Sequence, residues 1–281
     1  MVVSIVTVAV FITFSTIRMS GNLFLETFSI TNTKVLNQVK SRFEDYSYAV
    51  VTTMNDIQKN GTIKRVITEE SPNSLKAAMD YYSVIEQMNQ IYANVDYYDT
   101  NMIVVGKNEH LFNMNYAKWP VSYEELMDHP ITKNAIEQPS QLLFQFDPAT
   151  DGTMDQSVLV ASKALWERFT GELYGVLYIT IAERNLKQFY QNFTSVGNDI
   201  LLLNQTGTIV SSNRVEMIGT KALDILHYAK DSDGAANDSK EVEVLGEDYI
   251  LLAEYLPTYN MYLVNLIDKG IVVGDFINPS E

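Results

Sequence analysis

The most constraining feature of this 281-residue chain is an order of secondary-structure elements that occurs twice. In each occurrence the residue patterns predict two strands joined by a turn, then a short helix, then three further strands. The first occurrence covers residues 101–181 and the second covers 199–267. Repetition of a whole unit is typical of tandem structural modules. The sequence therefore predicts an α+β fold with two tandem lobes, each built on one antiparallel sheet.

A long amphipathic helix is predicted before the two lobes, from Ile30 to Lys59. Its apolar residues recur at steps of three and four, with Thr53 in the one gap, which is typical of one buried helix face: Leu36, Val39, Phe43, Tyr46, Val50 and Ile57. At about 1.5 Å per residue, this helix is roughly 40 Å long and can support both lobes. The same apolar seam could instead face a second copy of the chain, which would form a parallel homodimer.

Two signals predict how the helical part continues after the long helix. Asn60-Gly61 supplies a residue that readily becomes left-handed, so we expect the long helix to end there. Ser71 followed by Pro72 is typical of a helix start, and this predicts a second helix that runs to about Tyr92.

The run from Val2 to Ile17 is apolar apart from Ser and Thr. It is slightly shorter than the roughly 20 residues of a membrane-spanning helix, and no basic residue precedes it. We interpret it as a membrane anchor, with a buried strand or core helix as the alternative. A secretory signal is disfavoured because a basic front end and a small-residue cleavage site are missing.

The composition excludes several classes of function. There are 35 acidic and 20 basic residues, a formal net charge of -15, and no run of Lys and Arg, so we expect no nucleic-acid partner. The chain has no cysteine, which excludes thiol catalysis, disulfides and zinc sites built on thiolates. Its three histidines are scattered without ligand-like spacing. No metal and no cofactor are predicted.

Acidic residues provide the strongest argument for an enzyme, and that argument is weak. Glu124-Glu125 and the group Asp147, Asp151 and Asp155 could suggest a glycosidase or an oxygen-ligand metal site. However, the spacing of the three aspartates matches no calcium loop, and the common hydrolase and phosphate-binding motifs are missing. We predict that this region is not an enzyme. A surface-anchored hydrolase that depends on Asp147 or Glu125 is the alternative from a different class.

Three stretches of sequence resemble the double Cache sensor domain of bacterial receptors: GVLYITI at 175–181, DILLLNQTGTIVSS at 199–212 and YLVNLI at 262–267. The resemblance covers nearly all of the chain and implies two PAS-like sheets stacked along one long N-terminal helix. Within this family the chain is most similar to the sensor regions of YesM-like sensor histidine kinases of two-component systems. A chemotaxis receptor shares the same region and is the alternative.

The resemblance, together with the residue patterns, implies five segments. These are a membrane anchor and juxtamembrane segment (1–29), the long helix and second helix (30–92), a membrane-distal lobe (93–182), a linking helix with the membrane-proximal lobe (183–270), and a tail (271–281). The resemblance also implies that the folded region is extracellular and that the chain is held in the cell membrane.

The resemblance further implies that a small molecule binds in the distal lobe. Family members that bind amino acids keep an Arg, a Trp-Tyr pair and a late Asp. Here the region around His129 contains no Trp-Tyr pair, and Thr180 stands where that Asp would be expected. We therefore expect a small polar ligand, with a sugar or an organic acid favoured over an α-amino acid.

Candidate ligand-binding residues combine aromatic rings with a few polar groups, as is typical of pockets for small polar molecules. Lys163 is included because a charged residue on a central strand must be paired, lie at an edge or face a pocket. For each candidate, core packing or an ordinary ion pair is the alternative. The candidates are Trp119, Tyr123, Phe144, Asp147, Lys163, Tyr178 and Thr180.

Overall fold

The computed structural model describes residues 2–114, 119, 122–148, 157–167, 169–232, 240–244 and 246–271. The predicted anchor forms the first turns of the first helix, where almost all side chains lie outside this description. The predicted tail lies outside the described residues apart from Ile271. Within the described part of the chain, no helix combines the length and the apolar content needed to span a membrane.

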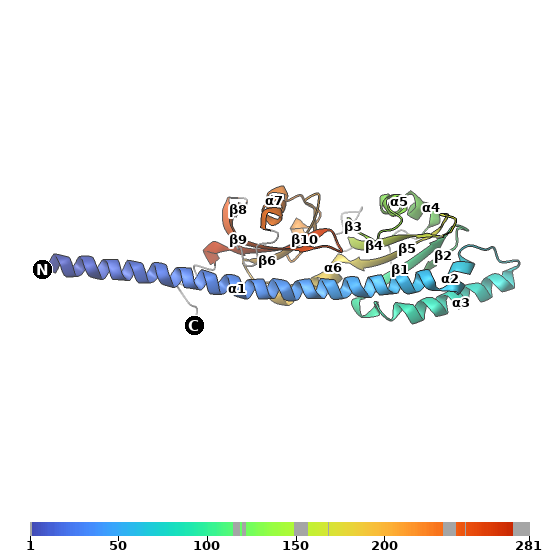
Figure 1. The fold of residues 1–281 in the computed structure, drawn as a ribbon, viewed down its shortest axis with the longest axis horizontal. Coiled ribbons are helices and arrows are strands. Elements are labelled where there is room, and N and C mark those ends of the chain that lie inside the picture. The colour runs from blue at the N-terminus through green and yellow to red at the C-terminus, as the bar shows by residue number, and fades with distance from the viewer. Residues whose placement is uncertain are drawn as a thin grey trace.

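The first helix, α1 (Val2–Lys59), is one continuous element of 58 residues that lies along both sheets (Figure 1). The predicted seam is buried, since each of its six residues is at most 1% exposed: Leu36, Val39, Phe43, Tyr46, Val50 and Ile57. Met54 joins it at 1%. These side chains belong to a core cluster that also contains residues of both sheets. The expectation that the seam faces a second copy is therefore wrong, because the chain's own sheets already cover it.

The chain reverses direction after α1 through a helix that the sequence did not predict. Asn60 has φ -75°, and its side chain accepts a hydrogen bond from the Ile63 amide, so Asn60 caps a new helix, α2 (Gly61–Val66). Gly61 is thus the first residue of a helix and not the left-handed end of one. An Asn side chain is a strong N-cap, and this explains the difference.

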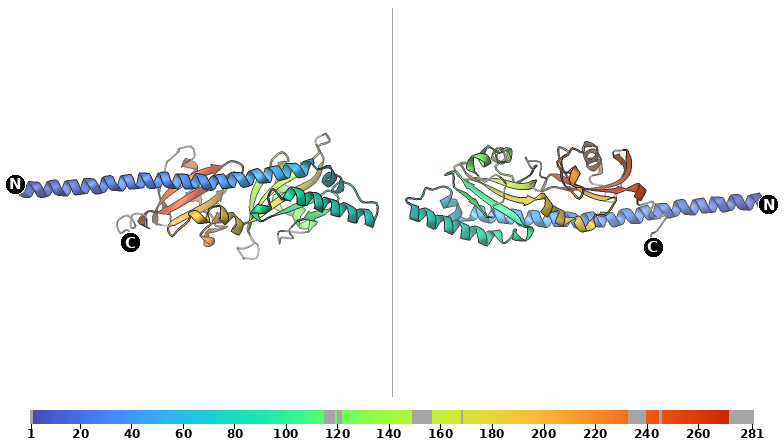
Figure 2. Two further views of the ribbon diagram at one scale, coloured as in Figure 1. Left: turned by 90° about the horizontal axis from the view of Figure 1, so that it is seen from below. Right: turned by 180° about the vertical axis from the view of Figure 1, so that it is seen from behind.

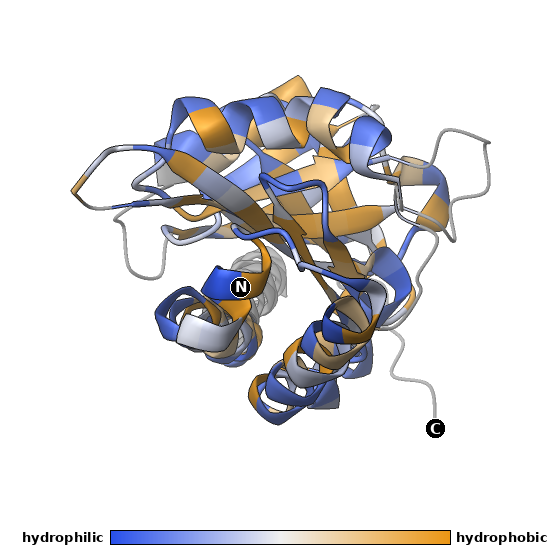
Figure 3. Ribbon diagram, turned by 90° about the vertical axis from the view of Figure 1, so that its right-hand side faces the viewer, coloured by the Kyte–Doolittle hydropathy of each residue, from blue (hydrophilic) through white to orange (hydrophobic). Residues whose placement is uncertain are grey.

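Helix α3 (Ser74–Tyr92) lies beside the distal end of α1 (Figure 2, left; Figure 3). Asn73 caps it by accepting from the Lys76 amide, whereas Ser71, the predicted cap, donates its hydroxyl to Asp80. Arg65 of α2 and Lys76 also pair with Asp80, at 2.8 and 2.9 Å. This ion-pair group fixes α2 against α3.

The distal sheet follows a short 3-10 helix, η1 (Asp96–Tyr98). Its described strands are all antiparallel and lie in the order β2-β1-β5-β4-β3. They are β1 (Thr100–Gly106), β2 (Leu111–Asn113), β3 (Leu143–Asp147), β4 (Val158–Trp166) and β5 (Leu173–Ala182). One face packs against α1, and α4 (Tyr123–Asp128) and α5 (Pro130–Glu137) cover the other face (Figure 1).

The proximal sheet repeats this arrangement, with the order β7-β6-β10-β9-β8. Its strands are β6 (Asn198–Asn204), β7 (Ile209–Ser212), β8 (Lys240–Val244), β9 (Glu247–Leu256) and β10 (Met261–Asp268). A 3-10 helix, η5 (Val215–Met217), follows β7, and α7 (Leu223–Ser232) packs on the face away from α1. The predicted order of strands in each lobe and the α+β fold with two similar lobes are confirmed.

The link between the sheets consists of three short helical pieces where the sequence predicts one helix. They are α6 (Glu183–Leu186), η3 (Lys187–Phe189) and η4 (Gln191–Phe193). Phe189 lies against α1, with its ring centroid 5.0 Å from that of Phe43 and 5.8 Å from that of Tyr46. The link is therefore packed on the long helix.

Candidate functional site

The strand register divides the distal sheet into two faces, and one of them gathers most of the predicted ligand-binding residues. Tyr178 and Thr180 of β5 pair with Ser162 and Val160 of β4. These residues share the face that α4 and α5 cover, because alternate residues of a strand point to opposite faces. Asp147 at the end of β3 pairs with Val158, and it lies on the same face.

Trp119 lies at the centre of this face. It sits in the connection between β2 and α4 and is 6% exposed. Its indole Nε1 donates to Asp147 Oδ2 at 2.7 Å, and its ring centroid is 5.3 Å from that of Tyr178 and 5.4 Å from that of His129. The indole thus fills the space between the sheet and α5.

His129 completes the environment of Asp147. It caps α5, with Nδ1 accepting from the Ile131 amide at 3.3 Å, so the proton of a neutral ring resides on Nε2. His129 Nε2 lies 3.3 Å from Asp147 Oδ2. Burial acts to raise the pKa of Asp147, but the hydrogen bonds from His129 and Trp119 outweigh it and lower this pKa. Asp147 is therefore an anion at neutral pH.

A second polar pair lies deeper in the cluster. Thr132 of α5 donates its hydroxyl to the Leu126 carbonyl. Its oxygen lies 2.7 Å from the Tyr178 hydroxyl, so Tyr178 is the donor in that hydrogen bond. Burial raises the pKa of Tyr178, and the phenol stays uncharged at physiological pH. This pair ties α5 to the centre of β5.

Tyr123 and Thr180 lie at the borders of the same cluster. Tyr123 is the first residue of α4, where Ser122 is the N-cap, and its ring packs against the apolar residues of this face. Thr180 is 3% exposed and faces its partners Asn101 and Val160 across the sheet. Both side chains lie on the covered face with Tyr178.

Phe144 and Lys163 lie on the opposite face, toward α1. The ring centroid of Phe144 is 4.3 Å from that of Tyr259 in the proximal lobe. Lys163 Nζ donates to Asn55 Oδ1 of α1 at 3.4 Å, and burial lowers the pKa of its ammonium. The structure thus brings five of the seven predicted residues onto one face and separates these two from them.

Two polar members of the cluster, His129 and Thr132, were not among the residues predicted from the sequence. The signal was present, because His-Pro at 129–130 places a capping side chain directly before a proline at the first helical position. With α5 recognised, Thr132 falls in its first turn. Only one short helix was predicted between the second and third strands, so the start of α5 was missed.

The arrangement is suited to recognition. Asp147 supplies an anion, Trp119 and Tyr178 supply aromatic walls, and the hydroxyl pair supplies hydrogen-bonding groups. Among the described residues, no three or more His, Asp or Glu side chains are grouped so that they could hold a metal ion.

Neither a protein-family model nor a curated protein matches the chain. Solved structures do match it. The ligand-binding domain of the Pseudomonas fluorescens chemoreceptor CtaA, in complex with L-isoleucine, has a TM-score of 0.57 and 14% identity; the match covers 90% of this chain and 97% of that one. The Campylobacter jejuni chemoreceptor Tlp3 domain with L-valine has a TM-score of 0.56 and 13% identity, with 89% and 96% covered.

A third similar structure is the ligand-binding domain of the Pseudomonas aeruginosa chemoreceptor PctB with L-Arg, with a TM-score of 0.56, 12% identity, and 88% and 96% covered. All three complexes contain amino acids, and this overturns our expectation that a sugar or an organic acid is favoured over an α-amino acid. That expectation assumed that only a few fixed positions can recognise an amino acid. An acidic group can also reach the covered face from another strand, and here Asp147 lies on that face at the end of β3.

These similar structures are ligand-binding domains. The long helix and the two antiparallel sheets match them over almost their whole length. The chain therefore has the double Cache fold of chemoreceptor ligand-binding domains, as its sequence predicted.

Proposed function

We propose that this chain is the extracellular small-molecule-sensing domain of a membrane receptor and that an α-amino acid binds in its distal lobe. The fold shared with chemoreceptor ligand-binding domains supports the sensing role. Their amino-acid ligands support the ligand class. In this proposal the predicted anchor holds the receptor in the membrane.

The observation that carries the proposal is the environment of Asp147. Its two hydrogen-bond donors among the described residues, Trp119 Nε1 and His129 Nε2, contact the same oxygen, Oδ2. Within the described part of the chain, Oδ1 has no hydrogen-bond partner. An ionised carboxylate with one free oxygen on an aromatic-lined face is a suitable acceptor for the ammonium group of an amino acid.

The ligand and the Trp119 indole compete for the same space in this proposal. The indole lies between Tyr178 and His129 and is almost completely buried. In this proposal a ligand that binds between the sheet and α5 beside Asp147 displaces the indole, and the released Nε1 finds another acceptor. Binding then rearranges the contacts among β3, β5 and α5.

Strand β3 gives that rearrangement a route to the rest of the molecule. Asp147 lies on its covered face, while Phe144 lies on the opposite face against Tyr259 of the proximal lobe. We propose that the ligand shifts the population between two arrangements of these contacts and that α1 carries the difference toward the membrane.

Two kinds of receptor are candidates for the full-length protein. The sequence resemblance to YesM-like proteins supports a sensor histidine kinase of a two-component system. The chemoreceptor neighbours support a chemotaxis receptor. Ligand-dependent phosphorylation of a histidine in the full receptor would identify the first, and ligand-dependent control of an associated kinase would identify the second.

The test uses fluorescence, because the chain contains only two tryptophans. In a Trp166→Phe variant, Trp119 is the only tryptophan, so the tryptophan emission reports on its environment alone. L-amino acids are titrated into this variant in parallel with sugars and organic acids. We expect a saturable emission change for one group of L-amino acids. Asp147→Asn should weaken that affinity at least tenfold, because a hydrogen bond to a charged group is worth about 1.5–3 kcal/mol.

Asp128→Asn is the matched control, since it makes the same change in the same lobe at a carboxylate that is 90% exposed. It should leave the affinity unchanged. If calorimetry finds amino-acid binding that Asp147→Asn does not weaken, the site is elsewhere. If sugars or organic acids bind and amino acids do not, the proposed ligand class is wrong.

A further inference from the structure

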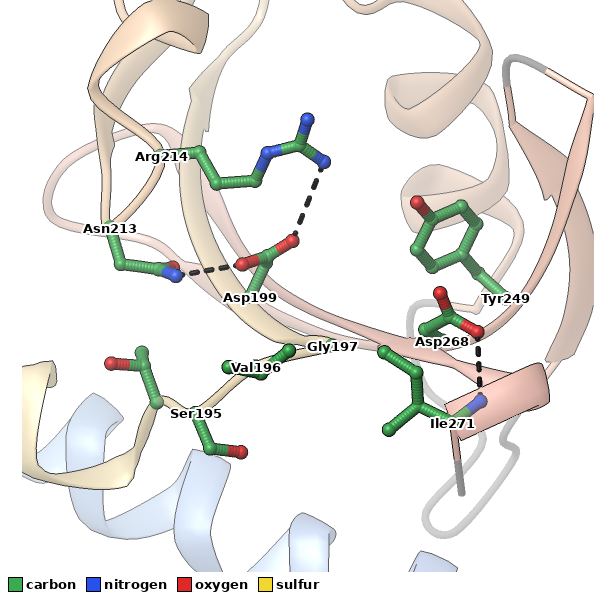
Figure 4. Close-up of a pocket in the computed structure, with 10 residues that line it drawn as sticks. Ser195, Val196, Gly197, Asp199, Asn213, Arg214, Tyr249, Asp268 and Ile271 are labelled. Carbon is green, nitrogen blue, oxygen red and sulfur yellow. Dashed lines mark hydrogen bonds and ion pairs between the residues drawn. The ribbon is translucent and has the colours of Figure 1, made fainter. Parts of the chain in front are cut away.

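The proximal lobe contains a pocket that the proposed function does not use. Its volume is about 530 Å³, which is within the range of small-molecule sites. Register pairs Asp199 with Leu266, and Tyr249 with Asp268, so these side chains share the face that α7 covers. They surround an open space at one end of the sheet (Figure 4).

One wall of this pocket is built by a close approach of two segments. Gly197 has φ +74°, and its carbonyl accepts a hydrogen bond of 2.7 Å from the Asp268 amide. A Cβ at position 197 would lie 2.6 Å from Ile271 Cδ1, so only glycine fits. This contact holds Ser195 and Val196 opposite the end of β10.

The positive charge of Arg214 in the pocket is already paired with the carboxylates of Glu216 and Asp199. Arg214 donates from Nε to Glu216 Oε1 at 3.1 Å, and its Nη1 lies 3.6 Å from Asp199 Oδ2. The hydrogen bond with Glu216, followed by the charges of Asp199 and Glu216, raises the pKa of Arg214, while burial acts to lower it. Asp199 also accepts from Asn213 Nδ2 at 2.7 Å. The guanidinium therefore offers little to an anionic ligand.

Asp268 adds a negative charge that has no cationic partner among the described residues. Its Oδ1 accepts from the amides of Gly270 and Ile271, at 2.8 and 3.1 Å. Figure 4 shows the other carboxylate oxygen on the side away from this helical turn. The described lining thus holds two carboxylates, Asp199 and Asp268, and one guanidinium, while a third carboxylate, Glu216, pairs with that guanidinium from just outside the lining. The described residues in and beside the pocket therefore carry a net negative charge.

From this charge balance and geometry we propose that the proximal pocket binds a small organic cation with a protonated primary amine. An ammonium group has three donors, and the free oxygen of Asp268, the carboxylate of Asp199 and the hydroxyl of Tyr249 are acceptors in the lining. The hydroxyl of Ser195 serves a second polar group on the ligand. This site is separate from the distal one and does not depend on the proposed function.

The probe is 1,4-diaminobutane, with 1,4-butanediol as the uncharged analogue of the same length, each titrated into the whole chain by calorimetry. We expect saturable binding of the diamine only, weakened by added salt. Asp268→Asn should weaken it about tenfold or more, because it removes the charge but keeps an oxygen that can still accept from Gly270 and Ile271. Tyr249→Phe should weaken it several-fold.

Arg214→Gln provides the sharpest test, because it removes a positive charge beside the ligand. It should tighten diamine binding, the opposite direction to Asp268→Asn. Asp147→Asn in the distal lobe should leave diamine affinity unchanged. Equal binding of the diol, no effect of Asp268→Asn in a folded variant, weaker binding in Arg214→Gln, or loss of binding in Asp147→Asn would each overturn the proposal.

Discussion

The ring centroids of Phe144 and Tyr259 lie 4.3 Å apart, although one residue belongs to the distal sheet and the other to the turn between β9 and β10. Tyr259 also donates its hydroxyl to the Phe43 carbonyl of α1 at 2.6 Å. The rings of Tyr259 and Phe43 meet edge to face. Both lobes and the long helix therefore meet at a single tyrosine.

The first prediction concerns energetic coupling between the lobes. In a double-mutant cycle with Phe144→Leu and Tyr259→Leu, we expect a coupling free energy of about 0.5–1.5 kcal/mol, because an aromatic pair contributes this much beyond its buried area. Chemical denaturation measures it. Phe144→Leu with Tyr97→Leu is the control, since Tyr97 is 89% exposed. A coupling near zero for the first cycle would mean that the lobes are energetically independent at this contact.

The second prediction concerns the hydroxyl pair of the distal site. Tyr178→Phe should lower the free energy of unfolding by about 0.5–1.5 kcal/mol, because one buried hydrogen bond is lost. Thr132→Val should cost more, since both the Tyr178 hydroxyl and the Leu126 carbonyl lose a partner. Tyr255→Phe, whose hydrogen bond to Asn260 is exposed, should have almost no effect. The reverse order of the first two costs would contradict the assigned direction of donation.

The third prediction concerns stability in acid. The hydrogen bond from Arg65, followed by that from Lys76, holds the pKa of Asp80 well below its usual range, while burial opposes them. A depressed folded-state pKa adds stability above the unfolded pKa of about 4, and this stability disappears as the pH falls through the folded value. The Tm of the wild type should therefore fall more steeply below about pH 4 than that of Asp80→Asn.

The matched control for acid stability is Asp128→Asn, at a carboxylate that is 90% exposed. Its Tm should follow that of the wild type across the acid range, and thermal melts at several pH values measure both variants. Parallel curves for Asp80→Asn and the wild type would show that the ion-pair group between α2 and α3 does not contribute to acid sensitivity.

The fourth prediction separates steric from conformational cost at glycine. Gly197→Ala should destabilise the fold by about 1–3 kcal/mol, through its positive φ and the clash with Ile271. Gly246→Ala has a similar φ of +84° but no atom within 4 Å, so it should cost less. Gly61→Ala, in helix α2 with open space around it, should be neutral or stabilising. A larger cost at Gly246 than at Gly197 would argue against a packed pocket wall.

The strands could be predicted because short apolar runs bounded by turn residues recur through both lobes, and helices cover both faces of each sheet, so the central strands are buried along almost their whole length. The ten described strands lie in the two predicted occurrences and extend beyond their bounds by only one residue at each end. The helix starts at Gly61 and Pro130 were missed, since the same Asn, Gly and Pro signals that end one helix also begin another. Backbone angles, which only the structure gives, decide between the two.

The candidate site could also be predicted in part. Strand alternation already separates Phe144 from Asp147 on β3, and applying it there would have excluded Phe144 from the covered face. His129 and Thr132 depended on recognising α5. The ligand class could not be deduced, because one carboxylate can reach a pocket from several strands, and the missing Asp at position 180 therefore carried little weight.

The continuity of α1 makes it a lever. Its seam is fixed to both sheets from Leu36 onward, and about 34 residues of the same helix precede that point, an arm of roughly 50 Å. A tilt of only about 1° at the sheets would then move the far end of this arm sideways by about 1 Å. Changes in the lobes that are smaller than a side-chain rotation would thus become displacements of atomic size at the N-terminal end.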